Sequence, residues 1–189
     1  MDYSANRDAQ MQLRAEIAKL RSELKTLQQQ PPGQSVDNHT FDTRSGQVTL
    51  QTLFAGETHL IVIHNMGITC NHCTLWADGL NGLYEHLRSK AAFVVASPDE
   101  PRVQESFANT RNWNFPMVSD PGSAFAQAMG YTVNGGAFPG VSVFRQEAER
   151  IERIADAPFG ENDLFCALWP LFDMLGEHTA DWEPQLQYE

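Results

Sequence analysis

Apolar residues recur at helical spacing near the N-terminus. Five of them, spaced 4, 3, 4 and 3 residues apart, share one a/d seam: Leu13, Ile17, Leu20, Leu24 and Leu27. Charged side chains cover the other faces, so the pattern predicts a helix over 5–30 that ends before Pro31-Pro32-Gly33. Such a helix either packs on its own domain or pairs two protomers. A coiled coil of only two heptads has marginal stability without further contacts. We expect a homodimer through this helix, with packing on the same chain as the open alternative.

Beyond the Pro-Pro-Gly break, strand-like and helix-like patterns alternate. Residues 40–50 alternate around a Ser45-Gly46 turn and predict a β-hairpin. Short apolar runs predict strands and longer amphipathic stretches predict helices. The expected strands or extended segments are 59–64, 91–96, 114–119, 140–145 and 150–154, the last antiparallel to its predecessor; the expected helices are 70–89, 101–110, 123–129 and 162–175. This alternation predicts an α/β domain with a central mixed β-sheet flanked by helices.

Two of these helices allow sharper expectations. The helix that follows the first buried strand is expected to bury four leucines: Leu75, Leu80, Leu83 and Leu87. The last helix is expected to be capped by Asn162, to run through Leu175 with a kink at Pro170, and to bury Cys166. The predicted organisation is an N-terminal helix and linker over 1–33, a domain over 34–178 and an acidic tail over 179–189.

Charge is distributed unevenly over the 189 residues, whose net charge is −11. Residues 146–189 hold two basic and eleven acidic groups. No Lys/Arg face suits phosphate backbones or anionic lipid, so nucleic-acid and membrane partners are disfavoured.

Neither a membrane-spanning apolar run nor a signal peptide is visible, and we expect a cytoplasmic protein. Three cysteines are too few for a secreted disulfide framework.

Cys70 and Cys73 form a Cys-x-x-Cys motif that follows a predicted strand and opens a predicted helix. Unpaired N–H groups and the positive end of the dipole at a helix N-terminus favour a thiolate, and only the thiolate attacks a disulfide or peroxide. Cys70, at the junction, is the expected nucleophile. Cys73 lies one turn further on the same face and can close a disulfide onto Cys70. His72 is expected to stabilise the thiolate.

Plainer interpretations of these residues stay open. The two cysteines could form half of a zinc site with His64 and His72, although no second Cys-x-x-Cys or His-x₃-His follows. They could also be inert buried thiols. We expect neither a metal nor a cofactor. Trp76 is expected to lie in the core or to line the pocket, and Asp78 to be either a solvated helix residue or a buried acid near the cysteines.

Five segments carry a family resemblance: Gly46-Gln47-Val48-Thr49-Leu50, His59-Leu60-Ile61-Val62-Ile63-His64, Cys70-Asn71-His72-Cys73-Thr74-Leu75-Trp76-Ala77-Asp78-Gly79, Trp113-Asn114-Phe115-Pro116-Met117-Val118-Ser119 and Phe138-Pro139-Gly140-Val141-Ser142-Val143-Phe144. In these segments the chain resembles the peroxiredoxin-like branch of the thioredoxin superfamily, and more closely an uncharacterised bacterial thioredoxin-like family of unknown function. The resemblance covers about the first 145 residues, including the leading helix.

This resemblance implies a thioredoxin-like fold and a set of site residues. Thioredoxin-type domains place a substrate-docking proline loop where Phe138-Pro139 stands here, and we expect Thr69 and Trp76 to contribute to substrate binding with this loop. Thioredoxins carry a Trp where Thr69 stands. His64 occupies the position of their buried proton-relaying acid, so it is either a base or a hydrogen-bonded core histidine.

Three functions compete. The first is a thiol–disulfide oxidoreductase acting on protein or small-molecule thiols and disulfides. The second is a thiol peroxidase, which fits less well: the peroxiredoxin pattern Pro-x-x-x-Thr-x-x-Cys lacks its proline here, and Thr69 is four residues before Cys73. Arg111 or Arg145 would have to clamp the peroxide. The third is a non-enzymatic binding or metal-binding module, whose acidic segment would face a basic partner.

Overall fold

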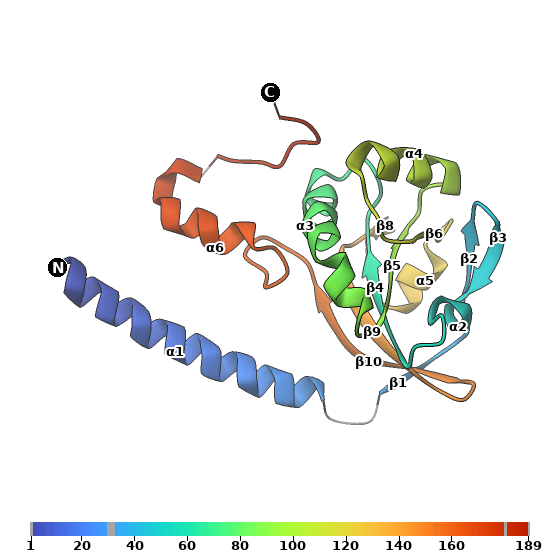
Figure 1. Ribbon diagram of the computed structural model, residues 1–189, viewed down its shortest axis with the longest axis horizontal. Coiled ribbons are helices and arrows are strands. Elements are labelled where there is room, and N and C mark those ends of the chain that lie inside the picture. Colours follow the sequence, from blue (N-terminus) through green and yellow to red (C-terminus); the bar gives the residue numbers. More distant parts are fainter. Residues whose placement is uncertain (1, 30–32, 180, 189) are drawn as a thin grey trace.

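The computed structural model describes residues 2–29, 33–179 and 181–188. Their central feature is an eight-stranded mixed sheet, in the order β1-β10-β9-β4-β5-β6-β2-β3 (Figure 1). The strands are β1 (Gln34–Val36), β2 (Thr40–Thr43), β3 (Gly46–Thr49), β4 (His59–His64), β5 (Ala92–Ser97), β6 (Met117–Ser119), β9 (Gly140–Glu147) and β10 (Arg150–Pro158). A separate small hairpin pairs β7 (Thr132–Val133) with β8 (Gly136–Ala137).

The sheet combines a parallel centre with antiparallel edges. β4, β5 and β6 run parallel, while β9 is antiparallel to β4 and β10 to β9. The predicted hairpin is present as β2 and β3, and β2 also pairs antiparallel with β6. The predicted α/β architecture is therefore confirmed. β1 and the far half of β10 were not anticipated, because β1 is only three residues long and its pairing to β10 joins distant parts of the chain.

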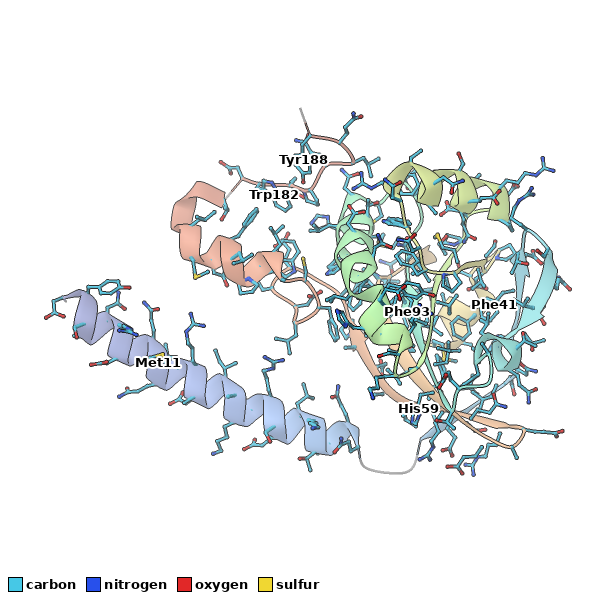
Figure 2. All side chains as sticks on the ribbon, viewed as in Figure 1. Met11, Phe41, His59, Phe93, Trp182 and Tyr188 are labelled. Carbon is cyan, nitrogen blue, oxygen red and sulfur yellow. The ribbon has the colours of Figure 1, made fainter. Side chains whose placement is uncertain are left out.

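Helices cover both faces of the sheet. One face carries α3 (Asn71–Arg88) and α4 (Pro101–Arg111), and the other carries α2 (Leu50–Leu53) and α5 (Ala124–Ala128). Alternation along β4 separates the two cores: Leu60 and Val62 pack with the α5 side, Ile63 with the α3 side. Figure 2 labels Phe41 and Phe93, which belong to these two cores.

The helix α3 buries a narrower stripe than predicted. Leu80 is buried, as predicted, but Leu83 is 52% exposed, so the prediction that α3 buries Leu83 is wrong. The buried positions Cys73, Trp76, Ala77 and Leu80 follow helical spacing, and the stripe continues through Tyr84, which packs on the core in place of Leu83. None of the described helices combines the length and apolar character needed to cross a bilayer.

The C-terminal segment departs most from prediction. Asn162 has a left-handed φ of +65° and caps no helix. Asp163 instead accepts the backbone N–H groups of Phe165 and Cys166 and forms a turn. The helix α6 spans only Leu168–Phe172, and the 3₁₀ segment η1 (Asp173–Thr179) follows. Pro170 lies in the first turn of α6, where its missing N–H has no intrahelical partner to lose.

The N-terminal helix α1 (Tyr3–Gln28) extends away from the sheet (Figure 1). Asp2 caps it by accepting the Ala5 N–H at 2.9 Å. Its existence and extent agree with the seam pattern, but it has no buried residue. The side chain of Met11 projects from it far from the domain (Figure 2).

Candidate redox site

Cys70 is the N-cap residue of α3, at the end of the loop that leaves β4. Its Sγ accepts a hydrogen bond from the backbone N–H of Cys73 at 3.1 Å. Its carbonyl oxygen accepts from the backbone N–H of Thr74 at 3.0 Å and from the Thr74 hydroxyl at 3.1 Å. A cysteine sulfur thus takes the capping role that Ser or Asp usually fills, and it faces the positive end of the helix dipole.

The two cysteine sulfurs lie in contrasting surroundings. Cys70 is half-buried, and the hydrogen bond from the Cys73 side chain lowers the pKa of Cys70 to about 7. The backbone N–H groups of Cys73 and His72 act in the same direction, while burial opposes them. Cys73 is buried, and both its role as donor to Cys70 and its desolvation raise its pKa. One sulfur is therefore poised as a thiolate and the other is held as a thiol.

The loop before the motif is fixed by acceptors that sequence reasoning missed. The Asp99 carboxylate accepts from the backbone N–H of Ile68 at 3.1 Å and from the Ser97 hydroxyl at 2.9 Å. The backbone N–H of Met66 donates to Cys73 Sγ at 3.4 Å. Gly67 adopts φ +108°, and a Cβ there would meet the Asp99 carboxylate at 3.0 Å. The available signal for Asp99 was its position just beyond β5, because β4 and β5 are parallel and end at the same edge.

The Phe138-Pro139 segment lies at this same end of the sheet. Gly140 pairs with His64, so Pro139 stands beside the residue that begins the cysteine loop. Pro139 is buried, and its carbonyl oxygen accepts the Phe159 N–H at 3.0 Å; Phe138 remains 37% exposed. Thr69 is exposed. Strand register therefore brings the proposed docking segment and the cysteine motif to one edge.

His72 directs its ring toward the C-terminal segment. Its Nε2 lies 3.6 Å from a carboxylate oxygen of Glu183, and its ring centroid is 6.0 Å from Trp76 and 6.5 Å from Trp169. The contribution of His72 to the pKa of Cys70 comes from its backbone N–H. Trp76 is buried and packs 5.3 Å from Phe159, centroid to centroid, as a core residue.

His64 belongs to the core on the α5 face, opposite to the cysteine helix. Its Nε2 lies 2.9 Å from the Ser142 hydroxyl oxygen, and its ring stacks on Tyr131 at 4.0 Å between centroids. Burial, helped by the positive charge of Arg153, lowers the pKa of His64 to about 3. The imidazole is neutral near pH 7, and the structure does not bring it together with Cys70 or Cys73.

The remaining charged candidates are engaged elsewhere. Asp78 accepts from the Trp113 indole at 2.8 Å and pairs with Arg111, whose Nη1 also donates to the Leu186 carbonyl at 2.5 Å. Arg145 pairs with Glu147 and Glu152 near the start of β4, away from the motif. Within the described parts of the chain, no cluster of three or more His, Cys, Asp or Glu side chains is arranged to hold a metal ion.

A parallel β4–β5 core flanked by helices, a helix-opening cysteine pair and a proline segment at the same sheet edge define a thioredoxin-like protein. Solved structures agree with this fold. The peroxidoxin BcpB of Mycobacterium tuberculosis matches with a TM-score of 0.55 and 21% identity, over 67% of this chain and 84% of that one. Reduced Prx3 of Vibrio vulnificus matches with a TM-score of 0.58 and 17% identity, over 77% and 99%. AhpC of Enterococcus faecalis matches with a TM-score of 0.57 and 14% identity, over 82% and 98%.

Residues 1–181 match the family described as "Bacterial protein of unknown function (DUF899)", and the chain belongs to that family. The match includes α1 and the whole cysteine site. No curated protein sequence matches the chain significantly.

Proposed function

We propose that the protein is a thiol–disulfide oxidoreductase in which Cys70 is the nucleophile and Cys73 the resolving cysteine. The contrast between the two sulfurs carries this proposal: Cys70 is half-buried with a pKa of about 7, and the buried Cys73 has a raised pKa and donates to it. A thiol whose pKa lies near ambient pH combines a large thiolate fraction with retained nucleophilicity.

The reaction has two exchange steps. The Cys70 thiolate attacks one sulfur of a substrate disulfide; a Cys70–substrate S–S bond forms, the substrate S–S bond breaks, and the other substrate sulfur leaves as a thiolate. Cys73 then gives its proton to that thiolate and attacks Cys70 Sγ, which forms the Cys70–Cys73 disulfide and releases the second substrate sulfur. The substrate gains two electrons and the cysteine pair loses two.

The flanking residues support substrate docking in this proposal. Exposed Phe138 and buried Pro139 offer an apolar edge beside the motif, and exposed Thr69 precedes the nucleophile. The N–H of His72 helps to stabilise the thiolate. The fitting partners are protein or small-molecule thiols and disulfides. A reducing compartment such as the cytoplasm suits this function, since it returns the pair to the dithiol form.

A thiol peroxidase is the second candidate, favoured by the fold shared with the peroxidoxin and peroxiredoxin structures. In that reaction Cys70 would attack a peroxide oxygen, giving a Cys70 sulfenic acid and an alcohol or water, and Cys73 would resolve it to a disulfide with release of water. Against it, Arg111 and Arg145 are paired with Asp78 and with Glu147 and Glu152. Peroxide consumption no faster than that of a free thiol would exclude this second candidate.

The direct test uses two single variants and a control. Cys73→Ser should accumulate a mixed disulfide with oxidised glutathione or with a disulfide-bonded protein, because the resolving step is removed. Cys70→Ser should form none and lose turnover. Cys166→Ser is the matched control and should behave as the unmodified protein, because Cys166 lies outside the motif, before α6, and burial raises the pKa of its thiol. Full turnover in both the Cys70 and Cys73 variants would overturn the proposal.

A further inference from the structure

The helix α1 presents an apolar seam that no other described residue of its own chain buries. The five seam residues are exposed to between 46% and 64%: Leu13, Ile17, Leu20, Leu24 and Leu27. The helix is 26 residues long with no buried residue. Helices in proteins gain most of their stability from packing of an apolar face. We therefore expect a partner to bury this seam.

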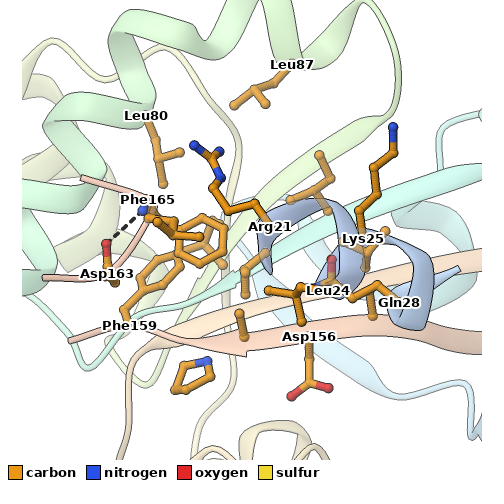
Figure 3. Close-up of a pocket in the computed structure, with 18 of the residues that line it drawn as sticks. Arg21, Leu24, Lys25, Gln28, Leu80, Leu87, Asp156, Phe159, Asp163 and Phe165 are labelled. Carbon is orange, nitrogen blue, oxygen red and sulfur yellow. Dashed lines mark hydrogen bonds between the residues drawn. The ribbon is translucent and has the colours of Figure 1, made fainter. Parts of the chain in front are cut away.

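A pocket of about 830 Å³ opens between the last turns of α1 and the α3 side of the domain (Figure 3). Leu24 lies on the α1 side, and Leu80, Phe93, Phe159 and Phe165 lie on the domain side. Two turns of helix, about 10 Å wide and 11 Å long, fill roughly 850 Å³. The pocket therefore matches a short stretch of one further helix placed beside α1.

The segment after β10 offers a second exposed apolar set: Leu164, Phe165, Leu171, Met174 and Leu175, which are 40–66% exposed. Together with the α1 seam this makes ten large side chains. A stable interface buries about 800 Å² per partner, which these ten reach if each loses about 80 Å². Charge is complementary as well, because residues 3–28 hold five basic and three acidic groups, whereas 159–178 hold four acidic groups and no Lys or Arg.

The charges beside the seam specify what kind of helix fits. With Leu13, Leu20 and Leu27 at d and Ile17 and Leu24 at a, the flanking e positions are Arg14 and Arg21 and the g positions are Glu16 and Glu23. In a parallel pair, g residues face e residues of the next heptad of the partner, which joins Glu16 to Arg21. An antiparallel pair would set Glu against Glu and Arg against Arg. The strict 4-3 spacing and Ile at an a position also favour two parallel strands.

We propose that α1 forms a parallel two-stranded coiled coil with α1 of a second copy of this chain, and that the last turns of each helix occupy the pocket of the other copy. Two-fold symmetry permits this arrangement, since each helix then lies between its partner helix and the domain of the partner. The cysteine pair lies outside this surface, so the inference stands apart from the proposed function.

Charge reversal tests this interface without removing an apolar residue. Glu16→Lys/Glu23→Lys makes all four of these flanking e and g positions basic, and Arg14→Glu/Arg21→Glu makes all four acidic. Light scattering should show two chains per particle for the unmodified protein. Each variant should dissociate, with a dissociation constant at least about tenfold higher, and an equimolar mixture should restore a two-chain particle with one chain of each kind. The alkylation rate of Cys70 reports a folded domain in every sample.

Orientation is tested by one added cysteine in the Cys70→Ser/Cys73→Ser background. Asn6→Cys stands at a d position, where parallel helices bring two copies together, and it should form a covalent dimer on oxidation. Ala15→Cys, at an outward f position, is the matched control and should not. A single chain per particle for the unmodified protein would show that α1 folds onto its own domain and would overturn the proposal. Two-chain particles in both charge variants would do the same, because the interface would lie elsewhere.

Discussion

The backbone N–H of Cys73 points at the Sγ of Cys70 over 3.1 Å and so joins the two sulfur-bearing residues across the first turn of α3. This contact makes one cysteine the helix cap and leaves the other buried beneath it. The Cys73 side-chain donor, which is the largest cause of the lowered Cys70 pKa, and this backbone N–H together stabilise negative charge on Cys70 in preference to Cys73. The order of attack in the proposed reaction follows from this asymmetry.

The rate at which Cys70 is alkylated should follow its thiolate fraction. Because the pKa of Cys70 is lowered to about 7, the rate should level off above about pH 8 and fall about tenfold per pH unit below pH 6. Iodoacetamide labelling with mass-spectrometric readout measures it at each pH. The control variant Cys70→Ser, which keeps Cys73 and Cys166, should show no fast labelling. If the alkylation rate of Cys70 had its pH midpoint near 8.5, about the pKa of a free thiol, the proposed stabilisation of the Cys70 thiolate would be contradicted.

Replacing Cys73 in two ways should separate its hydrogen bond from its sulfur. Cys73→Ala removes the side-chain donor that is the largest cause of the lowered Cys70 pKa, so that pKa should rise. Cys73→Ser keeps a hydroxyl donor, and its Cys70 pKa should stay below that of the alanine variant. Ultraviolet absorbance of the thiolate as a function of pH measures both. Equal pKa values in the two variants would show that the backbone N–H groups alone control Cys70.

Gly140, next to Pro139, should tolerate no side chain. A Cβ there would collide with the Tyr131 ring and approach the Ala157 carbonyl oxygen to 2.7 Å. Gly140→Ala should lower the free energy of unfolding by about 1–3 kcal/mol, as overpacking does. Gly79→Ala is the matched control, since nothing lies within 4 Å of its Cβ; in the interior of α3 it should stabilise by up to about 1 kcal/mol. Urea unfolding compares the two, and equal effects would refute the packing argument.

His64 should make the fold sensitive to acid. Its pKa is about 3 in the folded protein and 6.5 when unfolded, so the unfolded chain binds a proton first as pH falls. This contribution to stability is complete above pH 6.5 and is lost by about 1.4 kcal/mol per pH unit toward pH 3. His64→Gln lacks it, so the difference between unmodified and variant free energies of unfolding should change with that slope between pH 6 and 4. If the difference between the two free energies of unfolding did not change with pH, His64 would be protonated to the same extent in the folded and unfolded states. This result would contradict a neutral, buried histidine.

Local patterns predicted the parts of this fold that local interactions determine. The apolar run of β4, the helix opened by Cys70 and the seam of α1 all follow from residues within a few positions of one another. The sequence does not decide whether His64 is a catalytic base or a core residue. The answer depends on which face of the sheet its side chain occupies, and this is determined by packing against α5 and Tyr131. Asp99 was missed for a similar reason: it reaches the cysteine loop only because β4 and β5 are parallel neighbours.

The last helix shows how a local signal can mislead. Asn162 has the chemistry of an N-cap, but the adjacent Asp163 accepts three backbone N–H groups and closes a turn in its place. α6 therefore starts only at Leu168, with Pro170 in its first turn, and the buried Cys166 precedes the helix. Two neighbouring residues with equal capping chemistry compete, and the surrounding chain decides between them.

The most direct test of the central claim is the reduction potential of the Cys70–Cys73 pair, measured by glutathione titration with mass-spectrometric readout. The proposed function predicts one two-electron transition to an intramolecular disulfide, between roughly −120 and −270 mV, the range of thiol–disulfide oxidoreductases. Its position in that range tells an oxidant from a reductant. If Cys70 and Cys73 never form an intramolecular disulfide, exchange through this pair is excluded and the proposed function is wrong.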